Sequence, residues 1–315
     1  MARKISIIGA GMTGATTAHW LAERELADLV LVDVVEGMPQ RKALDLLEAM
    51  PVIGKDVRVI GSNDYAATED SDIVVITAGL PRKPGMSRED LLNTNADIVK
   101  KATEGTLKRS PDAIYIILTN PLDTMCYVTM KVGGLPRERV IGQAGILDSA
   151  RMRAFVAMEL GLSVENVACY VLGGHGDSMV PLTRHSNVAG VPLNEMLPAD
   201  KLAAIVDRTR KGGGEIVALL KQGSAFYAPS AAIAQMSESI LKNKNLILPC
   251  SIYLKGEYGL NDIFFGVPAQ LGSQGLVKVI EYKLNSEEKA MVEKSALEVK
   301  ESISALNIEP LPMAA

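Results

Sequence analysis

The chain has 315 residues, of which 48% are hydrophobic, 22% are charged and 4% are aromatic, and its formal net charge is −4 at pH 7. This length indicates two domains, and the composition is that of a globular protein with a mainly aliphatic core. A net negative charge argues against a nucleic-acid-binding surface, which usually carries a basic excess. No apolar run approaches the roughly 18 residues that a membrane-spanning helix requires, so we expect neither nucleic acid nor a membrane as a partner.

The first apolar run and the cysteines bear on the compartment. Ile5–Ile8 is too short for the core of a signal peptide, and a glycine motif follows it at once. Cys126, Cys169 and Cys250 are widely spaced and form no C-x-x-C pair. We therefore expect free, buried thiols in a reducing compartment, and a cytoplasmic protein.

Through about residue 143, short β-rich runs alternate with helical patterns. The expected strands are Ile5–Ile8, Leu29–Val32, Val57–Ile60, Ile73–Ile76, Ile114–Leu118 and Arg139–Ile141. The expected helices between them include Thr13–Leu26, Pro39–Met50, Asp90–Leu107 and Leu122–Val132. Strands joined by helical crossovers predict an α/β fold with a parallel, doubly wound Rossmann sheet.

After a boundary near residues 142–144 the pattern changes. The elements expected there are a helix over Leu147–Leu160, a strand over Val167–Leu172, long helices over Ala199–Lys221 and Ser224–Lys242, and a hairpin of Leu246–Leu254 with Asp262–Leu271. The first long helix contains the unusual Gly212-Gly-Gly214. A closing helix from about 286 to 306 is expected to be capped by Asn285, with Glu288 completing the cap. The expected domains are residues 1–143 and 144–315, the second a mixed α+β domain that shares an interface with the first.

A glycine motif opens the first expected helix. Gly9-Ala-Gly11-Met-Thr-Gly14 follows the first strand, and Asp33 stands at the end of the second. The glycines allow a tight turn, close approach of the backbone to a pyrophosphate and close packing of helix on strand. Asp33 would accept hydrogen bonds from the ribose hydroxyls and repel a 2′-phosphate, which favours NAD over NADP. The alternative for Asp33 is an ordinary acid in a turn.

Two further segments follow expected strands, where an α/β sheet binds its ligands. Thr119-Asn-Pro-Leu-Asp123 ends the fifth strand, and Asn120 is a candidate to direct its amide at the nicotinamide or the substrate, although Asn-Pro is also a turn signal. Gly79–Arg88 follows the fourth strand and holds cations without an acid. Arg82 and Arg88 suit a carboxylate or a developing oxyanion. The alternative for this loop is a solvated basic turn.

The chain has three histidines, and one of them has the surroundings of a catalytic residue. His175 lies in Gly173-Gly-His-Gly176 after an expected strand, where glycines let a ligand approach, and its side chain suits proton transfer near neutral pH. His19 and His185 have no such surroundings and are set aside. A catalytic histidine needs an orienting acceptor, and Asp148 offers a carboxylate on the same helix face as Arg151. An ion pair within the helix is the alternative that this spacing also allows.

The motifs GAGxxG, AGLPRKPGMSR, TNPLD, LDSAR and GGHGDS, together with Asp33, follow one another in an order that resembles the lactate/malate dehydrogenase family, and most closely its lactate dehydrogenase-like malate dehydrogenases. The resemblance runs from residue 4 to the closing helix. It implies His175 as the proton donor and acceptor, Asp148 as its orienting carboxylate and Arg151 as the group that grips the substrate's C1 carboxylate. It also implies that Arg88 polarises the reacting carbonyl and that Asn120 helps to place substrate and nicotinamide.

The resemblance makes residue 82 the main determinant of specificity. Lactate enzymes typically carry Gln there and malate enzymes Arg, so Arg82 implies a dicarboxylate. Burying the second carboxylate without a countercharge would cost several kcal/mol. Ala225, where lactate enzymes tend to hold Thr, leaves room for the larger acid. The expected cofactor-binding set is Gly9, Gly11, Met12, Gly14, Asp33, Asn95, Thr119 and Asn120.

The chain departs from the family pattern at Met12-Thr13 and at Arg41, which puts the strength of NAD binding and one surface in question. The resulting hypothesis is an NAD-dependent malate dehydrogenase that needs no metal and is a homo-oligomer, a tetramer in preference to a dimer. A lactate or other 2-hydroxyacid dehydrogenase is the first alternative. A dinucleotide-binding protein without turnover is the second.

Overall fold

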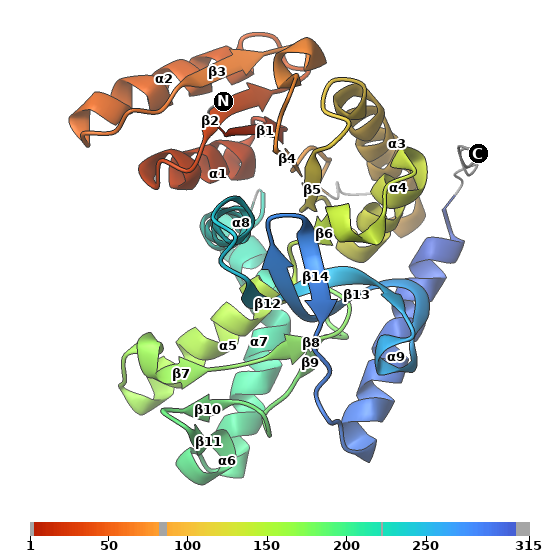
Figure 1. Ribbon diagram of the computed structural model, residues 1–315. Helices are drawn as coiled ribbons and strands as arrows, with labels where there is room; N and C mark the ends of the chain where they lie inside the picture. The colour runs from red at the N-terminus through yellow and green to blue at the C-terminus, as the bar shows by residue number, and fades with distance from the viewer. Residues whose placement is uncertain (1–2, 82–86, 222, 307–315) are drawn as a thin grey trace.

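The computed structural model describes residues 3–81, 87–221 and 223–306, and its centre is one continuous sheet (Figure 1). The strand order is β14-β13-β12-β6-β5-β4-β1-β2-β3. The strands of the first part of the chain are β1 (Lys4–Ile8), β2 (Asp28–Val32), β3 (Val59–Ser62), β4 (Ile73–Ile76), β5 (Ile114–Ile117) and β6 (Val140–Gly142). All five pairings among them are parallel. The predicted doubly wound parallel sheet is confirmed.

Helices cover both faces of this parallel part of the sheet. They are α1 (Met12–Glu23), α2 (Met38–Val52), α3 (Arg88–Leu107) and α4 (Leu122–Gly133), with short 3-10 turns at Tyr65–Thr68 and Arg137–Arg139. Ile5 and Ile7 of β1 belong to a core shared with α1 and α2, whereas Ile8 belongs to a core shared with α3 and α4. Alternate residues of one buried strand thus serve opposite layers, which is why the strands read as unbroken apolar runs.

The predicted hairpin is longer than expected and is not a separate sheet. β12 (Leu246–Lys255) pairs antiparallel with β13 (Asn261–Gly272), and β13 with β14 (Gly275–Val279), a strand that the sequence analysis missed. β12 also pairs with β6 at Ser251 and Gly142. The two halves of the chain therefore share one mixed sheet, with antiparallel strands added at its β6 edge.

The predicted strand over Val167–Leu172 is wrong in one respect, because it is two short strands in different sheets. β7 (Val167–Ala168) joins β10 (Asn187–Val188) and β11 (Val191–Pro192), whereas β8 (Val171–Leu172) pairs with β9 (Val180–Pro181). An apolar run shows that a segment is buried, but the run does not show which neighbour each part will pair with.

The remaining helices lie partly around these small sheets, in the lower part of Figure 1, and partly at its centre and right. They are α5 (Gly145–Leu160), α6 (Leu193–Met196), α7 (Ala199–Leu220), α8 (Tyr227–Leu241) and α9 (Ser286–Ser304), with 3-10 turns at Val164–Asn166 and Glu257–Gly259. α8 packs against α1, and α7 packs against α5. The capping box at the start of α9 is present as predicted, because Asn285 accepts from the Glu288 amide and Glu288 accepts from the Asn285 amide. The predicted ends of several helices differ from these bounds by a few residues.

The described part of the chain contains no helix with the length and apolarity to cross a membrane. Cys126, Cys169 and Cys250 are buried thiols without a disulfide, as expected. Burial raises the pKa of Cys169 to about 12 and raises the pKa of the other two thiols as well. The thiols are therefore uncharged near neutral pH.

The turn into β14 yields a stability prediction. Gly275 has φ +90°, and a Cβ there would run into the carbonyl oxygen of Glu138. Gly259 has φ +73° and open space around it. Both Gly→Ala variants bear the positive-φ cost of about 1–2 kcal/mol, but Gly275→Ala should lose roughly 1–3 kcal/mol more in chemical denaturation because of the clash. Equal losses would show that β14 shifts freely away from Glu138.

Candidate active site

The glycine motif forms the turn between β1 and α1. Gly9 has φ +103°, which favours glycine, and a Cβ on Gly14 would run into the Gly9 carbonyl oxygen. Gly11 is different, because a Cβ there would meet nothing within 4 Å. Gly9 and Gly14 are thus required by the turn itself, whereas Gly11 leaves open space at the beginning of a helix.

Asp33 ties this turn to the end of β2. Its Oδ2 accepts from the amide of Ala10 at 2.7 Å, and its Oδ1 accepts from the amide of Val35 at 2.9 Å. A carboxylate has about four acceptor positions, so each oxygen retains capacity for a ribose hydroxyl. The alternative reading of Asp33 as a turn residue is therefore correct in part, since it bonds its own turn and also holds the glycine loop.

These features fit a bound dinucleotide. The Gly11 space is one that a pyrophosphate could enter, and the N-cap residue Gly11 has no side chain with which to cap the first amides of α1. Free helix N-terminal amides favour an anion. Met12 is 57% exposed beside them, so the predicted Met12 position is accessible to a ligand. The residues present would hold NAD with its pyrophosphate at α1 and its adenosine ribose at Asp33.

Asn95, Thr119 and Asn120 meet where β4 and β5 end. Asn95 is buried, accepts from the Leu80 amide at 2.8 Å and donates to the Asn120 carbonyl at 2.7 Å. Thr119 is buried and donates to the Ala78 carbonyl at 2.7 Å. Asn120 is exposed. The fold thus brings these three predicted residues together, and the contacts of Asn95 and Thr119 brace the start of loop 79–88. Their contact with NAD stays a prediction.

Loop 79–88 begins in contact with this cluster. A Cβ on Gly79 would lie 2.6 Å from the Thr119 methyl group, so the loop backbone packs directly on the end of β5. Arg82 and the side chain of Arg88 lie outside the described residues. α3 begins at Arg88, with Ser87 and Asp90 forming a capping box.

The predicted chemical residues converge on Asp148 in α5. Its Oδ2 lies 2.9 Å from Nδ1 of His175, and its Oδ1 accepts from Nη1 of Arg151 at 3.0 Å. The sequence left a choice between an orienting carboxylate and an intrahelical ion pair, and the structure contains both. The three side chains are only 17%, 3% and 13% exposed for His175, Asp148 and Arg151, so the pairing is shielded from water.

The surroundings of His175 set its protonation. Burial, the largest influence, lowers the pKa of His175, but Asp148 and then Asp123 raise it, and the net pKa lies above the ordinary value. Because a carboxylate only accepts, the neutral imidazole carries its hydrogen on Nδ1 and leaves Nε2 as the basic atom. Within the described residues no hydrogen bond engages Nε2.

Sequence reasoning missed Asp123. This buried carboxylate at the start of α4 accepts from the His175 amide at 2.9 Å and from the Ser251 hydroxyl at 2.5 Å. Burial raises the pKa of Asp123, while these two donors lower it. Asp123 is part of the TNPLD motif, three residues after Asn120, but its apolar helical setting gave no sign of its partner. It binds the start of α4 to the histidine loop.

The loop of His175 is also held from two other elements. The Gly174 amide donates to Ser295 of α9 at 3.0 Å, and Gly173 and Gly266 exchange backbone hydrogen bonds at 3.0 and 3.1 Å. A Cβ on Gly174 would lie 2.7 Å from a Val299 methyl group. The glycines therefore let the loop lie against α9 and β13.

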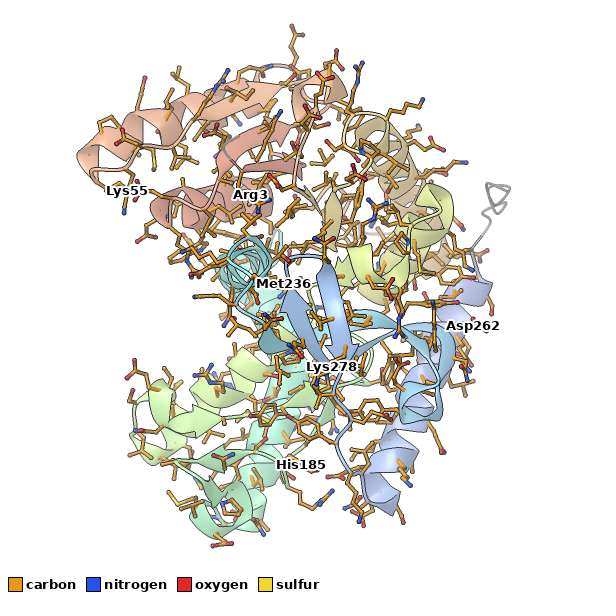
Figure 2. All side chains as sticks on the ribbon, in the orientation of Figure 1. Arg3, Lys55, His185, Met236, Asp262 and Lys278 are labelled. Atoms are coloured by element: carbon orange, nitrogen blue, oxygen red, sulfur yellow. The ribbon has the colours of Figure 1, made fainter. Side chains whose placement is uncertain are left out.

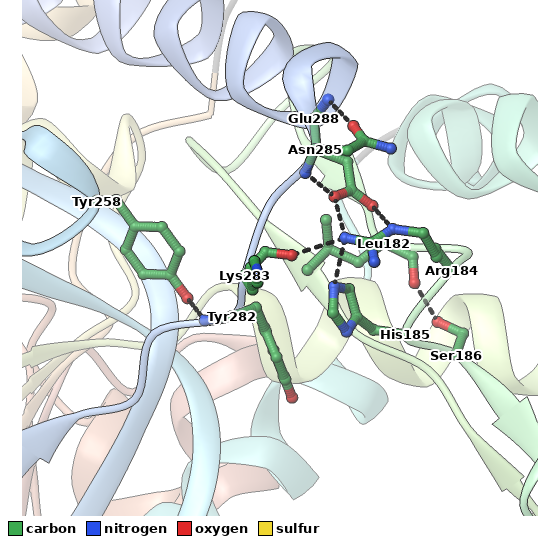
Figure 3. Close-up of polar contacts among 9 residues, drawn as sticks. All are labelled: Leu182, Arg184, His185, Ser186, Tyr258, Tyr282, Lys283, Asn285 and Glu288. Atoms are coloured by element: carbon green, nitrogen blue, oxygen red, sulfur yellow. Dashed lines mark hydrogen bonds and ion pairs between the residues drawn. The ribbon is translucent and has the colours of Figure 1, made fainter.

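His19 and His185 lie in other surroundings. His19 is exposed and stacks edge-on against Trp20, with ring centroids 5.7 Å apart. Figure 2 labels His185 in the lower part of the molecule. In Figure 3 its Nε2 faces Arg184, whose Nη2 is 3.1 Å away and also binds Glu288 at 2.7 Å. Arginine only donates, so the basic nitrogen of His185 is occupied by this contact.

A group of three or more His, Cys, Asp or Glu side chains placed to hold a metal ion is not found in residues 3–81, 87–221 and 223–306. The contacts above therefore describe a site built from an imidazole, carboxylates and a guanidinium. Such a set can move a proton and bind an anionic group.

Comparison with known proteins identifies the family of both halves of the chain. Residues 3–142 match the model of the lactate/malate dehydrogenase NAD-binding domain, and residues 146–308 match that of the lactate/malate dehydrogenase alpha/beta C-terminal domain. A curated malate dehydrogenase of Roseiflexus sp. (strain RS-1) is 59% identical over 97% of this chain and 99% of its own.

Solved structures of both kinds of enzyme resemble the fold. A malate dehydrogenase of Cryptosporidium parvum superposes with a TM-score of 0.95 at 42% identity, covering 97% of this chain and 99% of that one. A lactate dehydrogenase of Cryptosporidium parvum, complexed with lactic acid and NAD, also gives 0.95, at 40% identity, covering 98% and 99%. The backbone alone does not distinguish the two substrates.

The glycine motif yields a prediction that separates folding from binding. Gly11 has φ −66°, which alanine adopts, so Gly11→Ala should keep an unfolding temperature within roughly 5 °C of the unsubstituted protein. Its methyl group should weaken NADH binding about tenfold or more, measured by fluorescence titration. Gly14→Ala is the control, because its clash should destabilise the fold by roughly 1–3 kcal/mol. Unchanged NADH affinity in Gly11→Ala would place the pyrophosphate elsewhere.

Proposed function

The chain belongs to the lactate/malate dehydrogenase family, and we propose that it is an NAD-dependent enzyme that interconverts (S)-malate and oxaloacetate. The observation that carries the proposal is the pairing of one buried carboxylate, Asp148, with both His175 and Arg151. A proton-transferring group and an anion-binding group are thereby held side by side. That is the arrangement a 2-hydroxy acid requires, because its hydroxyl and carboxylate stand on neighbouring atoms.

In malate oxidation, neutral His175 takes the hydroxyl proton on Nε2 while Asp148 holds Nδ1–H. The imidazolium that forms is stabilised by the adjacent carboxylate, so the proton need not leave the site during the reaction. When bound, NAD supplies the hydride acceptor for the substrate's C2 hydrogen. In the reverse direction protonated His175 returns its proton to the carbonyl oxygen, and Arg88 offsets the charge that develops there.

Besides Arg88, two cations bind the substrate in this proposal. Arg151 binds the C1 carboxylate through its planar fork. Arg82 binds the second carboxylate when loop 79–88 closes and excludes water. With pyruvate, Arg82 would be left buried and unpaired, which disfavours the smaller substrate. Ala225 provides space for the dicarboxylate, and Asn120 orients the substrate and the nicotinamide.

The proposal also covers the domains, the compartment, the pathway and the assembly of the protein. Residues 1–143 would bind NAD and residues 144–315 would carry the substrate chemistry. We place the enzyme in the cytoplasm because its described cysteines are free thiols. We place its reaction in the tricarboxylic acid cycle because malate and oxaloacetate belong to that cycle. Apolar side chains exposed on α2, such as Leu44 and Leu47, support association of copies of the chain, and the family resemblance is what favours a homotetramer over a dimer.

Substrate choice is tested by steady-state kinetics with NADH. The ratio kcat/KM for oxaloacetate should exceed that for pyruvate by about 100-fold or more, because an unpaired buried charge costs ~3 kcal/mol. Arg82→Gln should move this ratio toward pyruvate by at least about tenfold. Lys83→Gln, which removes the neighbouring loop cation, is the control and should leave the ratio unchanged. A ratio that favours pyruvate would instead indicate a lactate dehydrogenase, and binding of NADH without turnover of any 2-oxo acid would indicate a non-catalytic protein.

The pH dependence tests the role of Asp148. Oxaloacetate reduction requires imidazolium, so its kcat/KM should be level at low pH and fall as the pH rises through the elevated pKa of His175. In Asp148→Asn the raising carboxylate is gone, so this fall should move to lower pH, and kcat should drop roughly 100-fold or more.

Asp177→Asn is the matched control for this experiment. It removes the same charge from an exposed position in the histidine loop, and its pH profile should match that of the unsubstituted enzyme. If Asp148→Asn also keeps the original profile, Asp148 does not set the protonation of His175.

A further inference from the structure

Three consecutive glycines lie in the middle of the unbroken helix α7, although their backbone conformation does not require glycine. Gly212, Gly213 and Gly214 lie within the helix Ala199–Leu220, and none has a positive φ. Each glycine inside a helix costs about 1 kcal/mol relative to alanine. A requirement other than backbone conformation must therefore account for at least one of them.

The space around each glycine differs. A Cβ on Gly212 would lie 2.8 Å from Cδ and 3.2 Å from Nε of Arg151. A Cβ on Gly213 would make an ordinary contact, 3.7 Å from Nη2 of the same side chain, and a Cβ on Gly214 would meet nothing within 4 Å. Gly212 is also the only one of the three that is buried, on the face of α7 that includes Ile205 and Thr209. Arg151 occupies the volume that a side chain at position 212 would fill.

Arg151 has little freedom to move aside. Its Nη1 is bound to Asp148 at 3.0 Å, and the other oxygen of Asp148 is bound to His175. The middle of the Arg151 chain, and not its free end, is what a methyl group at 212 would meet. A displacement of Cδ would therefore tilt the guanidinium or break its bond to Asp148.

The guanidinium also holds a donor that the protein leaves unused. Nε of Arg151 is buried and, among the described residues, has no hydrogen-bond partner. Because no hydrogen bond holds Nε, the position of this part of Arg151 depends on the atoms packed around it. On the side of α7, those atoms belong to Gly212.

We propose that Gly212 is a positioning residue for substrate recognition: its missing side chain seats Arg151 against the backbone of α7, at the depth and orientation from which the guanidinium binds the C1 carboxylate. The inference rests on the proposed function, because it assigns Arg151 to the substrate. It adds that the position of this substrate-binding arginine depends on the absence of a side chain at one residue of the neighbouring helix α7.

The test compares Gly212→Ala with Gly214→Ala, two identical changes in one helix. Gly214→Ala should keep or raise the unfolding temperature through helix propensity, whereas in Gly212→Ala the clash with Arg151 opposes that gain. Both variants should keep the KM for NADH. Gly212→Ala should lower kcat/KM for oxaloacetate about 10- to 100-fold, mainly through KM, because a misplacement of about 1 Å has effects of that size. Gly214→Ala should stay within about twofold of the unsubstituted enzyme. Equal kinetics for the two variants would overturn the proposal.

A double-mutant cycle with Arg151→Ala keeps the test decisive if Gly212→Ala alone folds poorly. In the Arg151→Ala background the clashing atoms are gone, so Gly212→Ala should fold and should change kcat/KM by less than about twofold. A loss that persists in this background would mean that Gly212 acts through something other than Arg151. The unsubstituted enzyme is measured alongside: failure to turn over any 2-oxo acid would refute the proposed function, whereas normal turnover with indifferent Gly212→Ala would refute only this inference.

Discussion

The rest of the site depends on the pairing of the Asp148 carboxylate with His175 and Arg151. This carboxylate is almost completely buried, and a buried charge is tolerated only when it is paired and hydrogen-bonded. Its two oxygens serve two different partners, the ring of His175 and the guanidinium of Arg151. Removing one partner of such a buried pair typically costs about 3–5 kcal/mol. Electrostatics therefore couples the group that we propose to move the proton to the group that we propose to bind the anion.

The histidine is placed by elements far apart in the chain. Asp123 at the start of α4, Ser295 of α9 and Gly266 of β13 each bond the backbone of residues 173–175. The continuous sheet makes this possible, because β12 pairs directly with β6 and brings the second half of the chain against the ends of the parallel strands. The chemical site thus lies where the cofactor-binding strands end, as expected for an α/β sheet.

Glycines serve the site in separate ways. Gly9 and Gly14 permit the turn between β1 and α1, Gly11 leaves space for a ligand, and Gly174 allows the histidine loop to lie against α9. Gly212 leaves space for a side chain of the site itself. At Gly14, Gly174 and Gly212 the missing Cβ lets the backbone lie close to another group, and that group differs from one glycine to the next, whereas a Cβ on Gly11 would meet nothing within 4 Å. The sequence therefore shows where the glycines are, and only the fold shows which group, if any, lies against each of them.

The sequence predicted the order of the strands and helices and the glycine turn after β1. It also singled out His175, Asp148 and Asp33, which the structure places in the His175–Asp148 pair and at the glycine turn. These features are local: they depend on periodicity, on glycine spacing and on motifs whose parts are neighbours in the sequence. Four features could not be inferred from the sequence. They are the double role of Asp148, the hydrogen bond from the His175 amide to Asp123, the division of residues 167–172 between two sheets, and the pairing of the hairpin with β6. Each depends on which distant segments pack together, and hydrogen bonding between residues tens to hundreds of positions apart leaves no periodic trace. The sequence determines which functional groups the protein has, whereas packing between distant segments determines which groups contact one another.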